Sequence, residues 1–424
     1  MKPIHRLPAL ALIAALAAVS AQAQINNNPP GGSGPGRGRG PGVEASVVTA
    51  ARSPVVNADN TLTFRLQAPN AKTVRVFTDF PKLGGVPVNG SAGFDMVKDT
   101  NGVWSYTSPK LAPSYYQYWF VMDGFSFPDP QNTFVRPASG VYKSMVALPG
   151  REAEWMMFRD VPHGNLTEHH YLNPENKTSR RVVVYTPPDY ATSGKSYPVV
   201  YLLHGANDYE RGWTQSGMAN TIMDNLIADG KAVPAIIVMP FGHDTTGSSG
   251  KLPEVRALQA SLGYTAPTNA NRGGPGAAFG GGTGPSYMEK DLLGYVLPYV
   301  EKEFRVIKEK KARAIMGYSM GGGHSTTIGF RHPELFSVVG GFSGYSRPAA
   351  EPLLTDPAKA NKDYKLIFIG SGTEDTAVNG GRTLHQVFTE KDVKHTWSED
   401  PGYGHDYQIW RIYLHRLLQQ MFRD

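Results

Sequence analysis

The stretch RAIMGYSMGG, residues Arg313–Gly322, predicts how the second half of the chain folds. It reads as an apolar strand that turns into a helix at the pattern Gly-x-Ser-x-Gly, with Ser319 between Gly317 and Gly321. Glycine on both sides removes the side chains that would clash in such a tight turn. The turn lifts the Ser319 hydroxyl above the sheet and leaves the Met320 N–H at a helix start, free to bond an oxyanion. Ser319 is therefore a candidate nucleophile and Met320 a candidate oxyanion donor.

Four other apolar runs surround this stretch, and each of them ends in glycine. They lie at residues 197–205, 235–242, 337–344 and 365–372. Alternating apolar strands and helices indicate an α/β domain whose mostly parallel sheet is covered on both faces. In such sheets the chemistry gathers at the carboxyl ends of the strands. We expect the helices at Met218–Asp229, Tyr287–Phe304, Gly322–Phe330, Thr383–Lys391 and Asp406–Phe422.

A serine nucleophile needs a base, and the base needs an orienting acid, in the chain order Ser, Asp, His. The run IFIGSGTEDTAV, residues 367–378, ends a predicted strand and presents Glu374 and Asp375 in the loop that follows. We prefer Asp375 as the acid, and the alternative is that either carboxylate is only a solvated loop charge. Of 12 histidines, His405 is the one in a glycine-bounded loop after the last predicted strand. The predicted triad is Ser319, His405 and Asp375.

The second oxyanion donor should come from the loop after an earlier strand. The run YLLHGAND, Tyr201–Asp208, ends the first strong apolar run of the α/β domain and makes the Ala206 N–H the candidate. His204 is expected to shape this turn rather than to react. The sequence contains no His/Asp cluster with the spacing of metal ligands. We therefore expect neither a metal nor a cofactor.

The first 158 residues are organised differently. Residues 1–23 join a short positive start, an apolar run and the ending AQA, which predicts a secretory signal peptide. Residues 24–44 are a Gly/Pro-rich linker. Residues 45–148 carry short runs of period-two alternation between turns, typical of a small immunoglobulin-like β-sandwich. After a second linker at residues 149–158, the α/β domain should occupy residues 159–424.

One segment, Gly242–Pro285, is too long and too rich in glycine for an ordinary loop. It follows a predicted central strand, so it should leave the sheet at the rim beside Ser319. Its apolar residues suit a lid over a flat aromatic acyl group better than over an acetyl group. We therefore expect a preference for feruloyl over acetyl esters. The alternative is a surface insertion that does not touch substrate.

Composition excludes several functional classes. The chain has 424 residues, 40% hydrophobic and 18% charged, which describes a globular protein. The net charge is only +6, and the sequence shows no cluster of basic residues alternating with aromatic residues, the pattern of a nucleic-acid-binding face. No nucleic-acid partner is therefore expected. Because there is no cysteine, neither disulfides nor a lipidated cysteine anchor can form. With the predicted signal peptide, this indicates a secreted or periplasmic protein without a membrane anchor.

Together the motifs resemble carbohydrate esterase family 1, the group of feruloyl and acetyl xylan esterases that is related to esterase D. The resemblance implies an α/β-hydrolase fold and a secreted serine esterase that removes acyl groups from plant cell-wall polysaccharide such as xylan. It assigns the family's triad and oxyanion donors to the five residues predicted above. The segments that carry it follow the family's order from Val161 to Trp410: VPHGNLTEHHY, RRVVVYTPPDY, LLHGANDYERGW, PAIIVMPFGH, RAIMGYSMGG, GTED and GYGHDYQIW.

The front domain resembles a second family. YYQYWFVMDGFSFPDPQN, Tyr115–Asn132, is similar to the early-set sandwiches of carbohydrate-binding module family 48. The resemblance implies a fold and, less directly, a sugar-binding surface. Because alternate strand positions face inward, we expect at least half of the aromatic residues to be core rather than a sugar platform. These residues are Trp104, Tyr115, Tyr116, Tyr118 and Trp119.

The same motifs are compatible with other functions. The expected partner is an acylated polysaccharide or oligosaccharide. Enterochelin-type esterases, which cleave catecholate siderophores, share the core and also carry a front sandwich. A sugar that outcompetes water for the acyl-enzyme would make the protein a transferase. A non-catalytic carbohydrate-binding protein on a hydrolase scaffold is disfavoured by the complete triad. Because the predicted triad lies wholly in the second domain, a chain starting near Arg151 is expected to fold and to cleave small esters.

Overall fold

The computed structural model describes residues 52–81, 93–138, 141–173, 179–206, 208–243 and 286–423. The predicted signal peptide, the Gly/Pro-rich linker and nearly all of the predicted lid, residues 244–285, lie outside the described residues. Residues Val47–Asp424 form one compact unit. Among the described residues, no helix has the length and apolar character needed to cross a bilayer.

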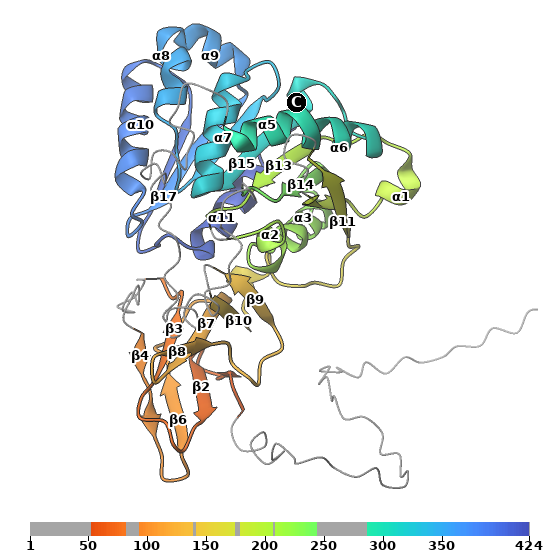
Figure 1. The fold of residues 1–424 in the computed structure, drawn as a ribbon. Coiled ribbons are helices and arrows are strands. Elements are labelled where there is room, and N and C mark those ends of the chain that lie inside the picture. The colour runs from red at the N-terminus through yellow and green to blue at the C-terminus, as the bar shows by residue number, and fades with distance from the viewer. Residues whose placement is uncertain are drawn as a thin grey trace, which may run out of the picture. The chain divides into compact units, whose positions relative to one another are not determined.

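The N-terminal part of this unit is an all-β domain of two sheets, as the alternating sequence predicts (Figure 1). One sheet has the order β1-β2-β6-β5, and the other has the order β4-β3-β7-β10-β9 with β8 paired to β7. Leu62, Phe64 and Leu66 of β2 point into a shared apolar core. The strands are β1 (Val55–Val56), β2 (Leu62–Gln67), β3 (Val74–Thr78), β4 (Phe94–Asp95), β5 (Val97–Lys98), β6 (Val103–Thr107), β7 (Ser114–Met122), β8 (Phe125–Phe127), β9 (Val135–Ala138) and β10 (Val141–Leu148).

Several aromatic residues of the front domain belong to its core. Trp104, Tyr116 and Tyr118 are buried, and the latter two are at most 1% exposed. Tyr115 and Trp119 are only half-buried, and the Trp119 ring stacks on Phe77 at 5.2 Å between centroids. Three of the five residues considered as a sugar platform are thus core residues, in line with the expectation from strand alternation.

The second part is an α/β domain with an eight-stranded sheet in the order β11-β12-β14-β13-β15-β16-β17-β18. From β14 to β18 neighbouring strands are parallel, and β11 and β12 join antiparallel at one edge. The mostly parallel sheet predicted from the apolar runs is therefore confirmed. The strands are β11 (Asn165–Leu172), β12 (Ser179–Thr186), β13 (Val199–Leu203), β14 (Ile236–Pro240), β15 (Arg313–Tyr318), β16 (Val338–Phe342), β17 (Leu366–Gly372) and β18 (Thr396–Asp400).

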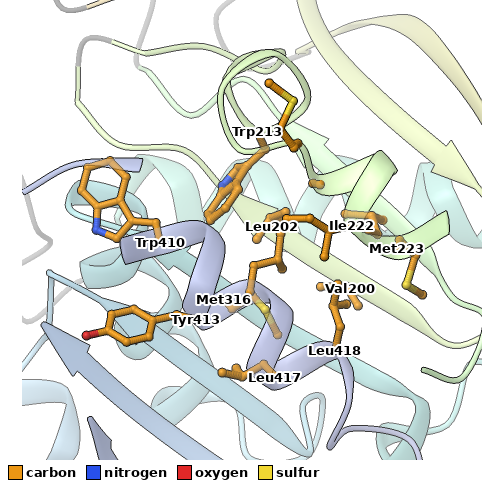
Figure 2. Close-up of a cluster of buried hydrophobic side chains, with 14 of the residues drawn as sticks. Val200, Leu202, Trp213, Ile222, Met223, Met316, Trp410, Tyr413, Leu417 and Leu418 are labelled. Atoms are coloured by element: carbon orange, nitrogen blue, oxygen red, sulfur yellow. The ribbon is translucent and has the colours of Figure 1, made fainter. Parts of the chain in front are cut away.

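Helices cover both faces of this sheet. Successive strand residues point to opposite faces, and since these residues are apolar, both faces must be buried. Val200 and Leu202 of β13 pack with the helices α3 and α11 in one core (Figure 2), whereas Tyr201 packs in the core on the other face. The α-helices are α1 (Tyr190–Ser193), α2 (Gly212–Gln215), α3 (Ala219–Ala228), α5 (Tyr287–Asp291), α6 (Leu297–Glu303), α7 (Met320–Arg331), α8 (Glu351–Thr355), α9 (Pro357–Asp363), α10 (Val378–Glu390) and α11 (Tyr407–Leu418). A π-helical turn, Leu292–Val296, joins α5 to α6.

Buried polar side chains join the two parts of the compact unit. Ser114 of β7 donates to the side-chain oxygen of Gln408 in α11 over 2.6 Å. The guanidinium of Arg411, also in α11 and fully buried, donates to the Tyr115 carbonyl over 3.0 Å. A chain that starts near Arg151 lacks Ser114 and Tyr115, and it leaves the buried Arg411 without two of its acceptors. These contacts argue against the expected independence of the second domain.

Candidate active site

Ser319 lies on a sharp turn between β15 and α7, in the left-handed region of backbone space (φ 54°) that non-glycine residues seldom occupy. Its N–H donates to the Phe342 carbonyl over 2.7 Å. A Cβ atom added to Gly321 would lie 2.5 Å from the Leu203 carbonyl oxygen, so only glycine fits beside the neighbouring strand. Met320 is the first residue of α7, and the N–H groups of a first helical turn have no acceptor within the helix. The predicted strand-turn-helix geometry is present.

His405 and Asp375 lie in two loops that meet at the same end of the sheet. His405 Nδ1 lies 2.9 Å from Asp375 Oδ1. The Asp375 side chain is fully buried, whereas that of His405 is 35% exposed. Asp375 Oδ1 also accepts from the Ala377 N–H over 2.7 Å, which fixes the carboxylate. Glu374, the alternative acid, is exposed to solvent.

His405 lines the same cavity as Ser319. A carboxylate at Nδ1 places the proton there and leaves Nε2 free to accept one, the arrangement that a base of this kind needs. Ser319, His405 and Ala206 all line one cavity of about 120 Å³. The His405 ring also packs perpendicular to the Trp410 ring at 5.1 Å between centroids, so the imidazole has contacts to Asp375 and to Trp410.

The loop after β13 passes directly over the serine. A Cβ atom added to Gly205 would lie 3.2 Å from Cβ of Ser319, which shows how closely the backbone approaches. Ala206 follows at the wall of the same cavity. His204 is buried, and its ring bonds the Gly205 carbonyl and the Gly242 N–H, each over 2.8 Å. Burial lowers the pKa of His204 to about 4, so this histidine is a neutral structural residue, as the sequence predicts.

Asp406, the neighbour of His405, has a different place. Its Oδ1 accepts from the Gln408 N–H over 2.9 Å and caps α11, as expected. Burial and the nearby Asp79 raise the pKa of the Asp406 carboxyl to about 7. The structure therefore brings Ser319 and His405 to one cavity and bonds Asp375 to His405, whereas Asp406 bonds the start of α11.

The sequence did not indicate that the front domain lines this cavity. Asp79, Gln117, Arg136 and Lys143 all come from its strands and the loops beside them. They lie 170 or more residues from Ser319 in the chain, and no local motif marks them. The only signal is a pair of cations seven residues apart in VRPASGVYKS, which the β9–β10 hairpin places opposite each other.

Asp208 connects the two parts at the cavity. One of its oxygens accepts from the hydroxyls of Tyr318 and Tyr407, the latter over 2.8 Å, and lies 3.4 Å from the Arg136 guanidinium. The side chains of Arg136 and Asp208 are 3% and 5% exposed. Burial alone would raise the pKa of Asp208, but Arg136 and the two hydroxyls outweigh burial and hold it below the usual value. Asp208 is therefore an ionised group within the protein.

Comparisons with known proteins agree with this architecture. Residues 174–421, more than half of the chain, match the family model of esterases. The chain belongs to this esterase family. Residues 52–138 match carbohydrate-binding module 48, the isoamylase N-terminal domain. The predicted resemblance, an esterase behind a domain of that module family, is confirmed.

Several relatives of this esterase carry informative names. This chain is 30% identical over 378 residues to an endo-1,4-beta-xylanase/feruloyl esterase of Xylanibacter ruminicola. The match covers 87% of this chain and 46% of that protein. The enterobactin esterase of Shigella flexneri is 19% identical, with a TM-score of 0.58 over 85% of this chain and 92% of that one. A feruloyl esterase module of Clostridium thermocellum is 16% identical, with a TM-score of 0.50 over 69% and 95%. The chain spans less than half the length of the first three curated relatives.

Proposed function

We propose that this esterase is a serine carboxylic-ester hydrolase in which Ser319 is the nucleophile, His405 the base and Asp375 the acid that orients it. The observation that carries the proposal is the His405–Asp375 hydrogen bond of 2.9 Å at the wall of the cavity that Ser319 enters from a strained turn. Strain of this kind persists where surrounding structure imposes it, and it clusters at active sites. The backbone N–H groups of Ala206 and Met320 are the proposed oxyanion donors.

The reaction follows from these positions. His405 Nε2 accepts the Ser319 proton as the hydroxyl oxygen attacks the ester carbonyl, and Asp375 stabilises the imidazolium that forms. The N–H groups of Ala206 and Met320 bond the negative oxygen of the tetrahedral intermediate, and one such donor contributes about 3 kcal/mol in comparable sites. His405 then protonates the departing alkoxide. Water repeats the attack on the acyl-enzyme, and the free acid leaves.

Feruloyl esters of plant cell-wall polysaccharide are the proposed substrates, in preference to acetyl esters. The support is the similarity to the Xylanibacter ruminicola protein, named a xylanase/feruloyl esterase, along 87% of this chain. The segment expected to act as a lid, residues 244–285, lies outside the described residues, so the acyl preference is carried by this similarity and by the sequence. The sequence of residues 1–23 supports export from the cytoplasm as part of the proposal.

A two-step experiment tests the proposal. A fluorophosphonate probe should label the full-length protein, and labelling should disappear in Ser319→Ala. The wild-type protein should then release ferulate from methyl ferulate faster than acetate from an acetylated xylan. Full labelling of Ser319→Ala would refute the proposed nucleophile, and an unlabelled wild type would leave the non-catalytic binding function in its place.

The second candidate is a catecholate siderophore esterase. The similarity to the Shigella flexneri enterobactin esterase covers 85% of this chain and therefore extends over both parts of the compact unit. At 19% identity this likeness concerns the fold, so it ranks below the feruloyl proposal. A catecholate trilactone added to the ester panel separates the two, because the preferred substrate has the higher kcat/KM.

A further inference from the structure

The front domain supplies one wall of the catalytic cavity. Gln117 of β7, Arg136 of β9 and Lys143 of β10 line the cavity together with Ser319 and His405. With a volume of about 120 Å³, it is smaller than the roughly 300–1,000 Å³ of sites that enclose a whole ligand. Whatever meets this wall is therefore a part of the substrate that lies next to the ester bond.

Two polar atoms of this wall have no hydrogen-bond partner among the described residues. They are Oε1 of Gln117 and Nε of Arg136, and both side chains are only 3% exposed. The Gln117 amide nitrogen donates to Asp79 over 3.1 Å, and Nη1 of Arg136 lies 3.4 Å from Asp208. Buried polar atoms are normally satisfied, so an unpaired acceptor and an unpaired donor, on two residues that line one small cavity, point to a partner that the described residues do not supply.

Lys143 adds a second set of donors. It stands directly opposite Arg136 in the antiparallel β9–β10 pair, where like charges repel. No carboxylate pairs with Lys143 within the part of the chain that the structure describes, and its ammonium lies 4.6 Å above the Trp119 ring. An ammonium has three donors. A ring face satisfies the charge but accepts no conventional hydrogen bond, so donors remain for a ligand.

The carboxylates decide which ligand fits. Asp79, Asp208 and Asp406 line the same cavity as Lys143 and Arg136, so the wall is not a net cationic site that selects an anion. Free donors beside a free acceptor suit hydroxyl groups, which both donate and accept. A feruloyl group carries its one hydroxyl at the end of the ring remote from the ester carbonyl, whereas a sugar alcohol carries several hydroxyls next to the ester bond. The partner of this wall is therefore the alcohol part of the ester.

We propose that Gln117, Arg136 and Lys143 form a subsite for the sugar that bears the ester, so that the front domain selects the leaving alcohol at the catalytic cavity itself. This inference rests on the proposed esterase function and names the substrate class of that same site. It gives the front domain a role at the reacting bond that does not depend on binding polymer elsewhere on its surface.

The test compares two ferulate esters that share the acyl group. One is methyl ferulate, and the other is the methyl glycoside of 5-O-feruloyl-arabinose. The measured quantity is the ratio of kcat/KM for the sugar ester to kcat/KM for the methyl ester. Lys143→Met removes the donors and keeps the length of the side chain, and it should lower the ratio about tenfold, the effect of one hydrogen bond to a charged group. Lys143→Arg, which keeps charge and donors, should retain most of the ratio.

A matched control exists in the same domain. Lys98 also holds its ammonium over a tryptophan ring, 5.6 Å from the centroid of Trp104, but it does not line the cavity. Lys98→Met should leave the ratio within twofold of wild type. A ratio within twofold of wild type in Lys143→Met would overturn the subsite, including the case in which both specificity constants fall together through a structural defect.

The outcomes also separate this inference from the proposed function. A wild type that cleaves both esters with a ratio insensitive to Lys143 refutes the subsite alone. A wild type that cleaves neither ester refutes the proposed function and the subsite with it. Should Lys143→Met fail to fold by circular dichroism, Lys143→Gln, which keeps a donor without the charge, replaces it, and an unchanged ratio there counts against the subsite in the same way.

Discussion

Replacing Arg136 with methionine tests whether the buried contact between the two parts of the compact unit stabilises the protein. The guanidinium lies 3.4 Å from Asp208, and both side chains are at most 5% exposed. Methionine fills a similar volume without the charge. The variant therefore leaves an ionised carboxylate in the interior, with the hydroxyls of Tyr318 and Tyr407 and the Tyr209 N–H as its remaining hydrogen-bond donors.

The expected loss follows from that burial. Breaking a buried ion pair by removing one partner costs about 3–5 kcal/mol in unfolding free energy, because the remaining charge is uncompensated. The two tyrosine hydroxyls continue to donate to Asp208, so we expect the lower end of that range, about 3 kcal/mol. Such a change shifts the folding equilibrium by roughly two orders of magnitude.

Urea unfolding followed by tryptophan fluorescence measures the change, with Arg382→Met as the control. Arg382 pairs with Glu399 over 2.5 Å at the surface, where its side chain is 50% exposed, and such pairs contribute about 0–1 kcal/mol. Adding Asp208→Asn to Arg136→Met should recover part of the loss, because it removes the buried charge. If Arg136→Met destabilises no more than Arg382→Met, or if the double variant recovers nothing, the pair does not join the two parts as described.

The remaining predictions concern the site and the domain contact. Ser319→Ala and His405→Ala should each abolish turnover of methyl ferulate with unchanged circular dichroism, and the double variant should be little worse than either single one. Asp375→Asn should lose most activity. If Glu374→Gln were the inactive variant instead, the acid would be Glu374 and not Asp375. Burial lowers the pKa of Lys143 to about 8, against about 10.4 in an unfolded chain. Between these two pH values Lys143 is protonated in the unfolded chain but largely neutral in the folded protein. The free energy of unfolding of the wild type should therefore rise with pH in this range, and Lys143→Met should lack that rise. A chain starting at residue 151 should lose solubility or unfold at lower urea; an unchanged midpoint would contradict the contacts described above.

The serine turn and the sheet around it were predictable because their signals are local. A strand, a tight glycine-flanked turn and a helix are encoded within ten residues around Ser319, and the carboxyl-end rule then places the loops of Asp375 and His405 beside it. Each of the helices α3, α7, α10 and α11 overlaps a range that was predicted to be helical from apolar spacing. In each case the pattern depends on a few neighbouring positions.

The cavity wall from the front domain was not predictable for the opposite reason. Arg136 of the front domain meets Asp208 of the α/β domain, and this contact depends on how one β-sheet packs against a loop far away in the chain. No periodicity or motif in one sequence records such a pairing. The sequence therefore supported two independent domains, whereas the structure shows polar side chains of the first inside the cavity of the second.

Asp208 bonds side chains from three separate segments that line this cavity. One oxygen of its carboxylate accepts from Tyr318, the residue before the proposed nucleophile, and from Tyr407, two residues after the proposed base. The end of β15 before Ser319 and the start of α11 after His405 are thus tied to a single buried charge. That charge is tolerable in the interior because Arg136 neutralises it from the front domain. Through Arg136 the front domain thus supports Asp208, in addition to supplying the proposed sugar subsite, and removing it should disturb Ser319 and His405 together.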